Sequence, residues 1–203
     1  MKLRIGAVVV ALSSLLSACS AGSDAEPAAA VTEVVTEVVE PETETQTVDA
    51  FHFESGTLEL GPFDPLEVYP DVFDPCQEIS DKEFAKAGFE TDRITTPMAD
   101  HSILSCTLLP IDRTEKFGLL LAGNIVDRAD LELQSTIIAE DVSQILPNMF
   151  LYVVDGLEEH NCSAAVATDR GHLIAFSVDG FTQYTQQDHC TNAIQTLENL
   201  ARS

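Results

Sequence analysis

Residues 161–178, with the sequence NCSAAVATDRGHLIAFSV, decide the fold of this chain. Two runs of small and apolar residues are separated by the polar turn DRG at residues 169–171. Such a pattern is typical of two antiparallel strands joined by a hairpin turn, in which Gly171 can adopt a positive φ. We therefore predict strands over 161–168 and 172–178.

The segment after this hairpin predicts the last helix of the chain, over residues 187–201. Asp188 lies near its start, where a carboxylate suits the helix dipole. Its apolar residues recur close to every 3.6 positions, which predicts one buried face. These residues are Cys190, Ala193, Ile194, Leu197 and Leu200.

A second helix is predicted before the hairpin, over residues 76–87. Ser80 and Glu83 have capping-box spacing, and Gly88 can end the helix. Between the two helices, three apolar segments predict strands, whereas residues 129–146 fit a helix or a strand equally well. The three predicted strands cover 102–109, 116–126 and 149–154. This order predicts an α+β fold, an antiparallel sheet with an N-terminal and a C-terminal helix packed on it.

The chain has 5 cysteines, and the four that follow Cys19 are an even set. An even number of cysteines in an exported chain indicates disulfides, and four cysteines allow three connectivities. Of these we expect the sequential pairing, Cys76–Cys106 and Cys162–Cys190. Each disulfide would then join a helix to the sheet.

The first residues of the chain predict export and lipidation. Lys2 and Arg4 precede a short apolar run, which is typical of a secretory signal peptide. The run is too short to span a bilayer, which takes roughly 20 apolar residues. Residues 16–19, LSAC, match a bacterial lipobox, so we predict that residues 1–18 are removed and that Cys19 carries the lipid. Two acyl chains on one cysteine are enough for a stable anchor.

We expect an acidic, disordered tether over residues 19–60 and a single domain over 61–203. No Lys or Arg occurs between Ser20 and Asp81, and like charges keep such a segment extended. Valines at helical spacing within 31–39 leave a short docking helix as an alternative. Residues 61–70, rich in proline and aromatic residues, predict an extended strap over the domain.

The net charge of the chain limits the classes of partner that it can bind. It contains 34 acidic and 10 basic residues, for a net charge of −24. Removal of Lys2 and Arg4 with the signal peptide takes the mature chain to −26 by the same count. Such a chain repels nucleic acid and anionic lipid head groups, so we expect no nucleic-acid partner. The membrane contact is expected to come from the lipid anchor.

Several motifs resemble one family of actinobacterial cell-envelope lipoproteins, which open with Asp-Pro-Cys and form a domain of unknown function. The motifs are FDPCQEI at 73–79, NCS at 161–163, DRG at 169–171 and DHC at 188–190. The resemblance covers about residues 72–200 and implies an exported, membrane-anchored domain with two disulfides and no assigned activity. Members often carry an aromatic residue, commonly Trp, after the second cysteine, whereas this chain has Cys106-Thr107-Leu108 and no Trp.

Metal and cofactor motifs are weak. His160 and His189 lie close to cysteines, but the C-x₂₋₄-C spacing of zinc sites is absent, so we expect these histidines to be solvent-facing neighbours of a disulfide. The calcium loop D-x-[DN]-x-[DN]-G and the glycine-rich phosphate loops are also absent. Four acids could still gather an ion incidentally, namely Asp64, Glu67, Asp71 and Asp74. We predict no metal and no cofactor.

Catalytic motifs are equally scarce. The sequence has neither G-x-S-x-G nor S-x-x-K, and His101 next to Ser102 is sequential rather than spatial proximity. Glycosidases use paired carboxylates, but a chain this acidic produces such pairs freely. The available carboxylates are Asp127, Asp130, Glu158 and Glu159.

These observations favour a non-catalytic binding or interaction module of the cell envelope, whose ligand is an envelope protein, a lipid or a glycan. The alternative is an envelope hydrolase acting on glycan or lipid, with a site that forms only in three dimensions. A deep cleft containing a buried carboxylate or a Ser/His pair would favour the hydrolase. A shallow apolar groove would favour the binding module.

Overall fold

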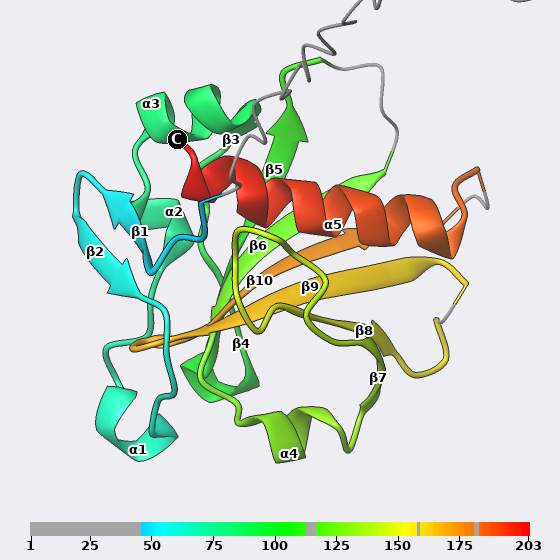
Figure 1. Ribbon diagram of the computed structural model, residues 1–203, viewed down its shortest axis with the longest axis horizontal. Helices are drawn as coiled ribbons and strands as arrows, with labels where there is room; N and C mark the ends of the chain where they lie inside the picture. Colours follow the sequence, from blue (N-terminus) through cyan, green and yellow to red (C-terminus); the bar gives the residue numbers. More distant parts are fainter. Residues whose placement is uncertain (1–45, 113–116, 158, 181–182) are drawn as a thin grey trace, which may run out of the picture. The chain divides into compact units, whose positions relative to one another are not determined.

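The computed structural model describes residues 46–112, 117–157, 159–180 and 183–203 (Figure 1). The expected signal peptide, Cys19 and the tether up to residue 45 lie outside the described residues, as do Lys116 and Glu158.

Most of the described strands form one antiparallel sheet of eight strands. Seven of them run in the order β3-β5-β6-β10-β9-β8-β7, and β4 pairs with β5. Their bounds are Phe89–Thr91 (β3), Thr96–Met98 (β4), Ile103–Pro110 (β5), Gly118–Asn124 (β6), Ser135–Ala139 (β7), Phe150–Val154 (β8), Asn161–Thr168 (β9) and Gly171–Val178 (β10). The predicted hairpin, β9 and β10, occupies the middle of the sheet, so the α+β prediction is confirmed.

The register of this hairpin sets which residues share an end of the sheet. Gly171 lies opposite Thr168, and Ser177 lies opposite Cys162. Gly171 has the expected positive φ, +107°, and a Cβ at this position would lie 2.7 Å from the carbonyl oxygen of Asn124. The turn therefore requires glycine for both its conformation and its close contact with β6.

Alternation along the strands gives the sheet two buried faces. On one face Cys162, Ala164 and Val166 of β9 join the main core, which also includes Leu173 and Ala175 of β10. The opposite face carries a smaller cluster, made of Phe150, Tyr152, Ala165 and Ile174. Because both faces are covered, the central strands are almost continuously buried.

The C-terminal helix α5 (Gln186–Ala201) lies across the main face, over β9 and β10 (Figure 1). Thr185 forms its N-cap in a capping box with Asp188. The predicted apolar face is buried except for Ile194, which is partly buried. His189 and Thr196 are also buried.

The helix predicted over 76–87 is two helices, α2 (Pro75–Glu78) and α3 (Asp81–Ala87). Ser80 has extended backbone geometry because it is the N-cap of α3, so the chain leaves the helical conformation there. The capping box with Glu83 is confirmed, and Gly88 ends α3 in the left-handed conformation.

A hairpin of β1 (Ala50–Phe53) and β2 (Gly56–Glu59) lies within the range expected to be tether. Phe51 is fully buried in the main core, and Phe53 stacks on Phe73 with ring centroids 5.8 Å apart. The packed domain therefore begins before residue 61, because this hairpin supplies aromatic side chains to the core.

Two other segments also differ from the predictions. The ambiguous segment 129–146 combines a short helix, α4 (Arg128–Leu131), with the edge strand β7. The strap 61–70 is not extended throughout, because α1 (Pro65–Val68) interrupts it.

The two disulfides have the predicted sequential pairing. Cys76 of α2 bonds to Cys106 of β5, and Cys162 of β9 bonds to Cys190 of α5. Each bond ties a helix to the sheet. All four sulfurs are therefore in disulfides, which excludes them as metal ligands or nucleophiles in this state.

Candidate functional site

The short helix α1 is an exposed ridge at one end of the sheet. Asp64 forms its N-cap, with Oδ1 accepting a hydrogen bond from the Leu66 backbone N–H at 2.8 Å, and Pro65 follows at the first helical position. None of the residues of α1 is buried. The side chain of Leu66 is 88% exposed and that of Tyr69 is 53% exposed. Large apolar groups are thus held in water by a well-capped turn.

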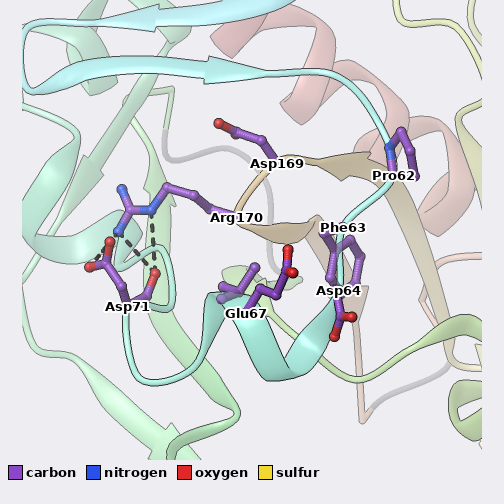
Figure 2. Close-up of a pocket in the computed structure, with 8 residues that line it drawn as sticks. Pro62, Phe63, Asp64, Glu67, Asp71, Asp169 and Arg170 are labelled. Carbon is purple, nitrogen blue, oxygen red and sulfur yellow. Dashed lines mark hydrogen bonds and ion pairs between the residues drawn. The ribbon is translucent and has the colours of Figure 1, made fainter.

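A first hollow of about 460 Å³ lies on one side of α1 (Figure 2). Four carboxylates and one guanidinium contribute to its wall. The lining residues are Pro62, Phe63, Asp64, Glu67, Val68, Asp71, Asp169 and Arg170. Three of the four acids that the sequence offered as an incidental ion site therefore do line one hollow. The fourth, Asp74, instead accepts a hydrogen bond from the backbone N–H of Cys76 as the N-cap of α2.

Arg170 lines this hollow and links the β9–β10 turn to Asp71 and Glu78. Its Nη2 donates to Glu78 Oε1 at 3.0 Å and to Asp71 Oδ1 at 3.3 Å, and its guanidinium lies over the ring of Phe73. Figure 2 shows the side chain directed toward Asp71. Burial disfavours the charged form, but the bonds and attraction of Glu78 outweigh burial, so the pKa of Arg170 is raised. Its charge is largely offset by its own partners.

A second hollow of about 550 Å³ lies on the other side of α1. It combines an apolar surface with three carboxylates. The lining residues are Asp64, Pro65, Leu66, Tyr69, Ser102, Ile125, Val126, Asp127 and Asp130. Asp127 caps α4 by accepting a hydrogen bond from the Asp130 backbone N–H at 2.8 Å. Leu66 and Tyr69 thus share this hollow with residues of the loop after β6 and the start of α4.

A Ser-His-Asp arrangement is present, but it lies elsewhere. Ser177 Oγ is 2.9 Å from His189 Nδ1, and His189 Nε2 is 3.6 Å from Asp179 Oδ1. His160 Nδ1 lies 3.9 Å from the same oxygen of Asp179. The prediction that both histidines face solvent is wrong, since His189 is fully buried and His160 is only partly exposed.

The surroundings of Asp179 keep it ionised. Burial acts to raise the pKa of Asp179, but hydrogen bonds from the backbone N–H groups of Gln183 and Tyr184, together with the attraction of His189, outweigh burial. The pKa of Asp179 is therefore lowered. This carboxylate lies beside Nε2 of His189 at 3.6 Å, beyond hydrogen-bond distance, while Ser177 forms a hydrogen bond with the other ring nitrogen.

Among the described residues, the three side chains of this Ser-His-Asp arrangement are closed off from solvent. Ser177 and His189 are fully buried, and the side chain of Asp179 is 1% exposed. Neither hollow beside α1 includes any of the three. The register also separates them, because Ser177 lies opposite Cys162 at one end of β9, whereas the turn that lines the first hollow follows the other end.

A further buried histidine lies beneath the candidate site. His172 packs between Phe63 and Phe150, with edge-on ring contacts at 4.9 and 5.7 Å. Burial lowers the pKa of His172 to about 4, although its hydrogen bond to the backbone of Val126 acts to raise the pKa. The imidazole is therefore neutral near pH 7 and serves as an aromatic support for the chain that leads into α1.

The other residues considered for catalysis in the sequence do not form one constellation among the described residues. His101 is exposed on the 3₁₀ turn Ala99–His101, and Ser102 lines the second hollow. Asp127 and Asp130 share that hollow, whereas Glu159 is exposed in the β8–β9 turn. Within the described residues, no three metal-ligating side chains are placed to hold a metal ion.

The exposed ridge itself was not anticipated from the sequence. One available signal was Asp64-Pro65, an N-cap followed by proline at the first helical position, repeated as Asp74-Pro75 at α2. Exposure of Leu66 depends on packing that no local pattern encodes.

The structure thus defines a disulfide-linked α+β domain whose candidate site is a pair of acidic hollows about an exposed apolar ridge. The chain belongs to the family described as "Protein of unknown function (DUF3558)", which matches residues 14–202. No curated protein and no solved structure matches it. In the part of the chain that the structure describes, no helix has the length and apolar character needed to cross a membrane.

Proposed function

We propose that this protein is a lipid-anchored, extracytoplasmic binding module of a bacterial cell envelope, with the surface about α1 as its binding site. The module is non-catalytic and acts at the outer face of the cytoplasmic membrane. Its resemblance to actinobacterial envelope lipoproteins agrees with this assignment.

Export and anchoring are supported by two separate features. Residues 16–19 have lipobox spacing after a short apolar run. The two disulfides also agree with an oxidising compartment outside the cytoplasm. Cys19 accepts the lipid, and the acidic segment after it separates the domain from the membrane.

The observation that carries the binding role is the exposure of Leu66 and Tyr69 between two open hollows. Leu66 is 88% exposed, so its apolar side chain is in unfavourable contact with water. A ligand that covered this side chain would gain the free energy of burying it. The hollow next to these side chains falls within the usual size range of ligand sites, about 300–1,000 Å³.

The alternative is an envelope hydrolase acting on glycan or lipid, and Ser177 with His189 and Asp179 is the one observation in its favour. These groups are closed off from solvent. A hydrolase would require an opening near the N-terminal end of α5. The exposed ridge requires no such change, so the binding module is the better-supported function.

Membrane fractionation tests the anchor. Cys19→Ala is expected to leave the protein unprocessed or to release it from the membrane fraction, because the lipid acceptor is lost. Ser20→Ala is the matched control and is expected to remain processed and membrane-bound. A mature, membrane-bound Cys19→Ala protein would show that the anchor assignment is wrong.

Site-directed photo-cross-linking in the producing cells tests the binding role. A photoreactive residue at Leu66 is expected to capture a reproducible partner, protein, lipid or glycan. The control position is Leu157, which is 45% exposed in the turn before β9. The β9–β10 turn that lines the first hollow lies at the other end of this strand. An identical set of products at both positions, or none at Leu66, would contradict a site at α1.

A further inference from the structure

The charge around α1 restricts what can bind there, and this inference rests on the proposed binding function. The two hollows share Asp64 and together contain six carboxylates. These are Asp64, Glu67, Asp71, Asp127, Asp130 and Asp169. Arg170 is the one cation among the lining residues, and Glu78 and Asp71 already pair with it. The ridge is therefore apolar at its crest and negative on both sides.

The same charge disfavours three candidate occupants. The tether of this chain carries no Lys or Arg from Ser20 to Asp81. A second copy of the mature chain brings another large negative charge. It has 34 acidic residues and eight basic ones, because Lys2 and Arg4 are removed from the 10. Anionic lipid head groups are repelled for the same reason. A cationic partner is attracted instead.

The apolar part of the second hollow adds a second requirement. Leu66, Tyr69, Ile125 and Val126 all line this hollow. Ile125 is buried, whereas Leu66 is almost fully exposed to water. A ligand with only positive charge would leave this surface uncovered. A hollow of about 550 Å³ suits a few side chains of a peptide rather than a folded domain.

We propose that the groove between α1 and the β6–α4 loop binds a lysine- or arginine-bearing peptide segment of another envelope protein. An apolar side chain of that segment packs against Leu66 and Tyr69. Its cations lie beside Asp64, Asp127 and Asp130. Apolar contact supplies most of the affinity, and charge supplies selectivity and rate of association.

Fluorescence anisotropy with synthetic peptides tests this proposal. The protein is the whole mature chain with Cys19→Ser, which leaves out the lipid. The main probe is a dye-labelled amphipathic peptide of lysine and leucine. A lysine–serine peptide keeps the charge without the apolar side, and a glutamate–leucine peptide reverses the charge. Only the lysine–leucine peptide is expected to bind well, with both comparison peptides weaker by about tenfold or more.

Matched variants separate the groove from the general acidity of the chain. Leu66→Ser is expected to weaken binding about tenfold, and Leu157→Ser at the far turn is expected to leave binding unchanged. Asp130→Asn is expected to weaken binding and to reduce its salt dependence. Glu159→Gln removes one exposed carboxylate from the far turn and is expected to have no such effect. Equal affinity of Leu66→Ser and wild type, or equal losses in groove and control variants, would overturn the proposal.

The cross-linking result separates this inference from the proposed function. A peptide segment rich in lysine or arginine captured at Leu66 supports both. A lipid or a glycan captured there keeps the binding module but overturns the cationic peptide. The absence of any specific capture at Leu66 removes the binding site itself.

Discussion

His189 Nδ1 lies 2.9 Å from Ser177 Oγ, and neither side chain reaches solvent. The pair joins the first turn of α5 to β10, next to the disulfide between Cys162 and Cys190. The other ring nitrogen of His189, Nε2, lies 3.6 Å from Oδ1 of the Asp179 carboxylate. The cluster thereby fixes the start of α5 on the sheet.

Ser177→Ala tests this structural role. The substitution leaves the buried Nδ1 of His189 without its partner, which costs about 1–3 kcal/mol in free energy of unfolding. Urea denaturation of the oxidised protein measures this change. His52→Ala is the control, because His52 is exposed and its removal is expected to cost less than about 0.5 kcal/mol. Unchanged stability combined with loss of a hydrolytic activity would favour the hydrolase.

Glu83 connects the β1–β2 hairpin to α3. Its carboxylate accepts hydrogen bonds from the backbone N–H groups of Glu54 at 2.7 Å and Ser80 at 2.8 Å. Burial acts to raise the pKa of Glu83, but these bonds outweigh burial and lower the pKa. Glu83→Gln is expected to lower the free energy of unfolding by about 1–2 kcal/mol, because an amide offers one acceptor oxygen instead of two.

Hydrogen exchange locates the effect of this substitution. The amide of Glu54 is expected to exchange faster in Glu83→Gln, while amides of β9 keep their protection until global unfolding. Glu159→Gln, the exposed control, is expected to change neither stability nor exchange. Faster exchange spread evenly over the sheet would show that Glu83 does not act on the hairpin specifically.

The hairpin and α5 could be predicted because their determinants are local. The strands at 161–168 and 171–178 are bounded by a glycine turn, and the apolar period of 186–201 is helical over four turns. The sequence leaves three disulfide connectivities open, and the sequential pairing that we expect among them is the one that the structure has. These elements required no long-range information.

Composition groups the β1–β2 hairpin with the tether, because neither segment contains Lys or Arg. In residues 50–53, AFHF, only His52 is exposed, so buried and exposed positions alternate only weakly. No Lys or Arg marks a boundary before Asp81. Burial of Phe51 comes from contacts with α5 and the core, which are distant in the sequence. Composition therefore placed the domain boundary too late.

The candidate site was only partly predictable. The sequence offers Asp64, Glu67 and Asp71 as a possible group of acids, and all three line one hollow. Asp127 and Asp130 join the site only because the loop after β6 ends near α1. Likewise, the approach of Ser177 to His189 depends on α5 crossing β10. Such tertiary relationships have no signature in spacing.

The lowered pKa of buried His172 predicts that the free energy of unfolding falls on mild acidification. Its pKa is about 4 in the folded protein and near 6.5 when exposed, so the unfolded chain binds the proton first. The contribution is fully present above pH 6.5 and is lost as the pH falls toward 4. Between about pH 7 and pH 5 the expected loss is about 2 kcal/mol in free energy of unfolding.

His172→Phe isolates this effect, because phenylalanine can keep the packing against Phe63 and Phe150 without titrating. The variant is expected to show a flatter dependence of stability on pH over the same interval, measured by urea denaturation. Carboxylates with lowered pKa, such as Asp179, lose their contribution only at lower pH. Parallel curves for wild type and His172→Phe would contradict a buried neutral His172.

Loss of either disulfide is expected to be costly. Each closes a loop of about 30 residues, and restriction of the unfolded chain by such a loop contributes about 3 kcal/mol. Cys76→Ala with Cys106→Ala, and separately Cys162→Ala with Cys190→Ala, remove one bond each without leaving a free thiol. Intact mass before and after reduction checks that the wild-type protein has two bonds. A mass that shows free thiols would revive metal binding by cysteine.

Arg170 supplies the last prediction, since it links the β9–β10 turn to the segment between α1 and α2. Its fork meets both carboxylate oxygens of Glu78, and both side chains are about three-quarters buried. Arg170→Ala removes the cationic partner of Glu78 and leaves its partly buried carboxylate with the backbone N–H of Asp74, so we expect a loss of about 1–3 kcal/mol. Arg170→Lys keeps the charge but loses the planar fork, so an intermediate loss is expected.

A double-mutant cycle with Glu78→Gln distinguishes the pair from general packing. The combined loss for Arg170→Ala with Glu78→Gln is expected to be smaller than the sum of the single losses, because both changes remove the same interaction. Hydrogen exchange should show faster opening in residues 71–78, which include Asp71 of the first hollow, in both single variants. Strictly additive losses would mean that Arg170 acts chiefly through its contact with the ring of Phe73.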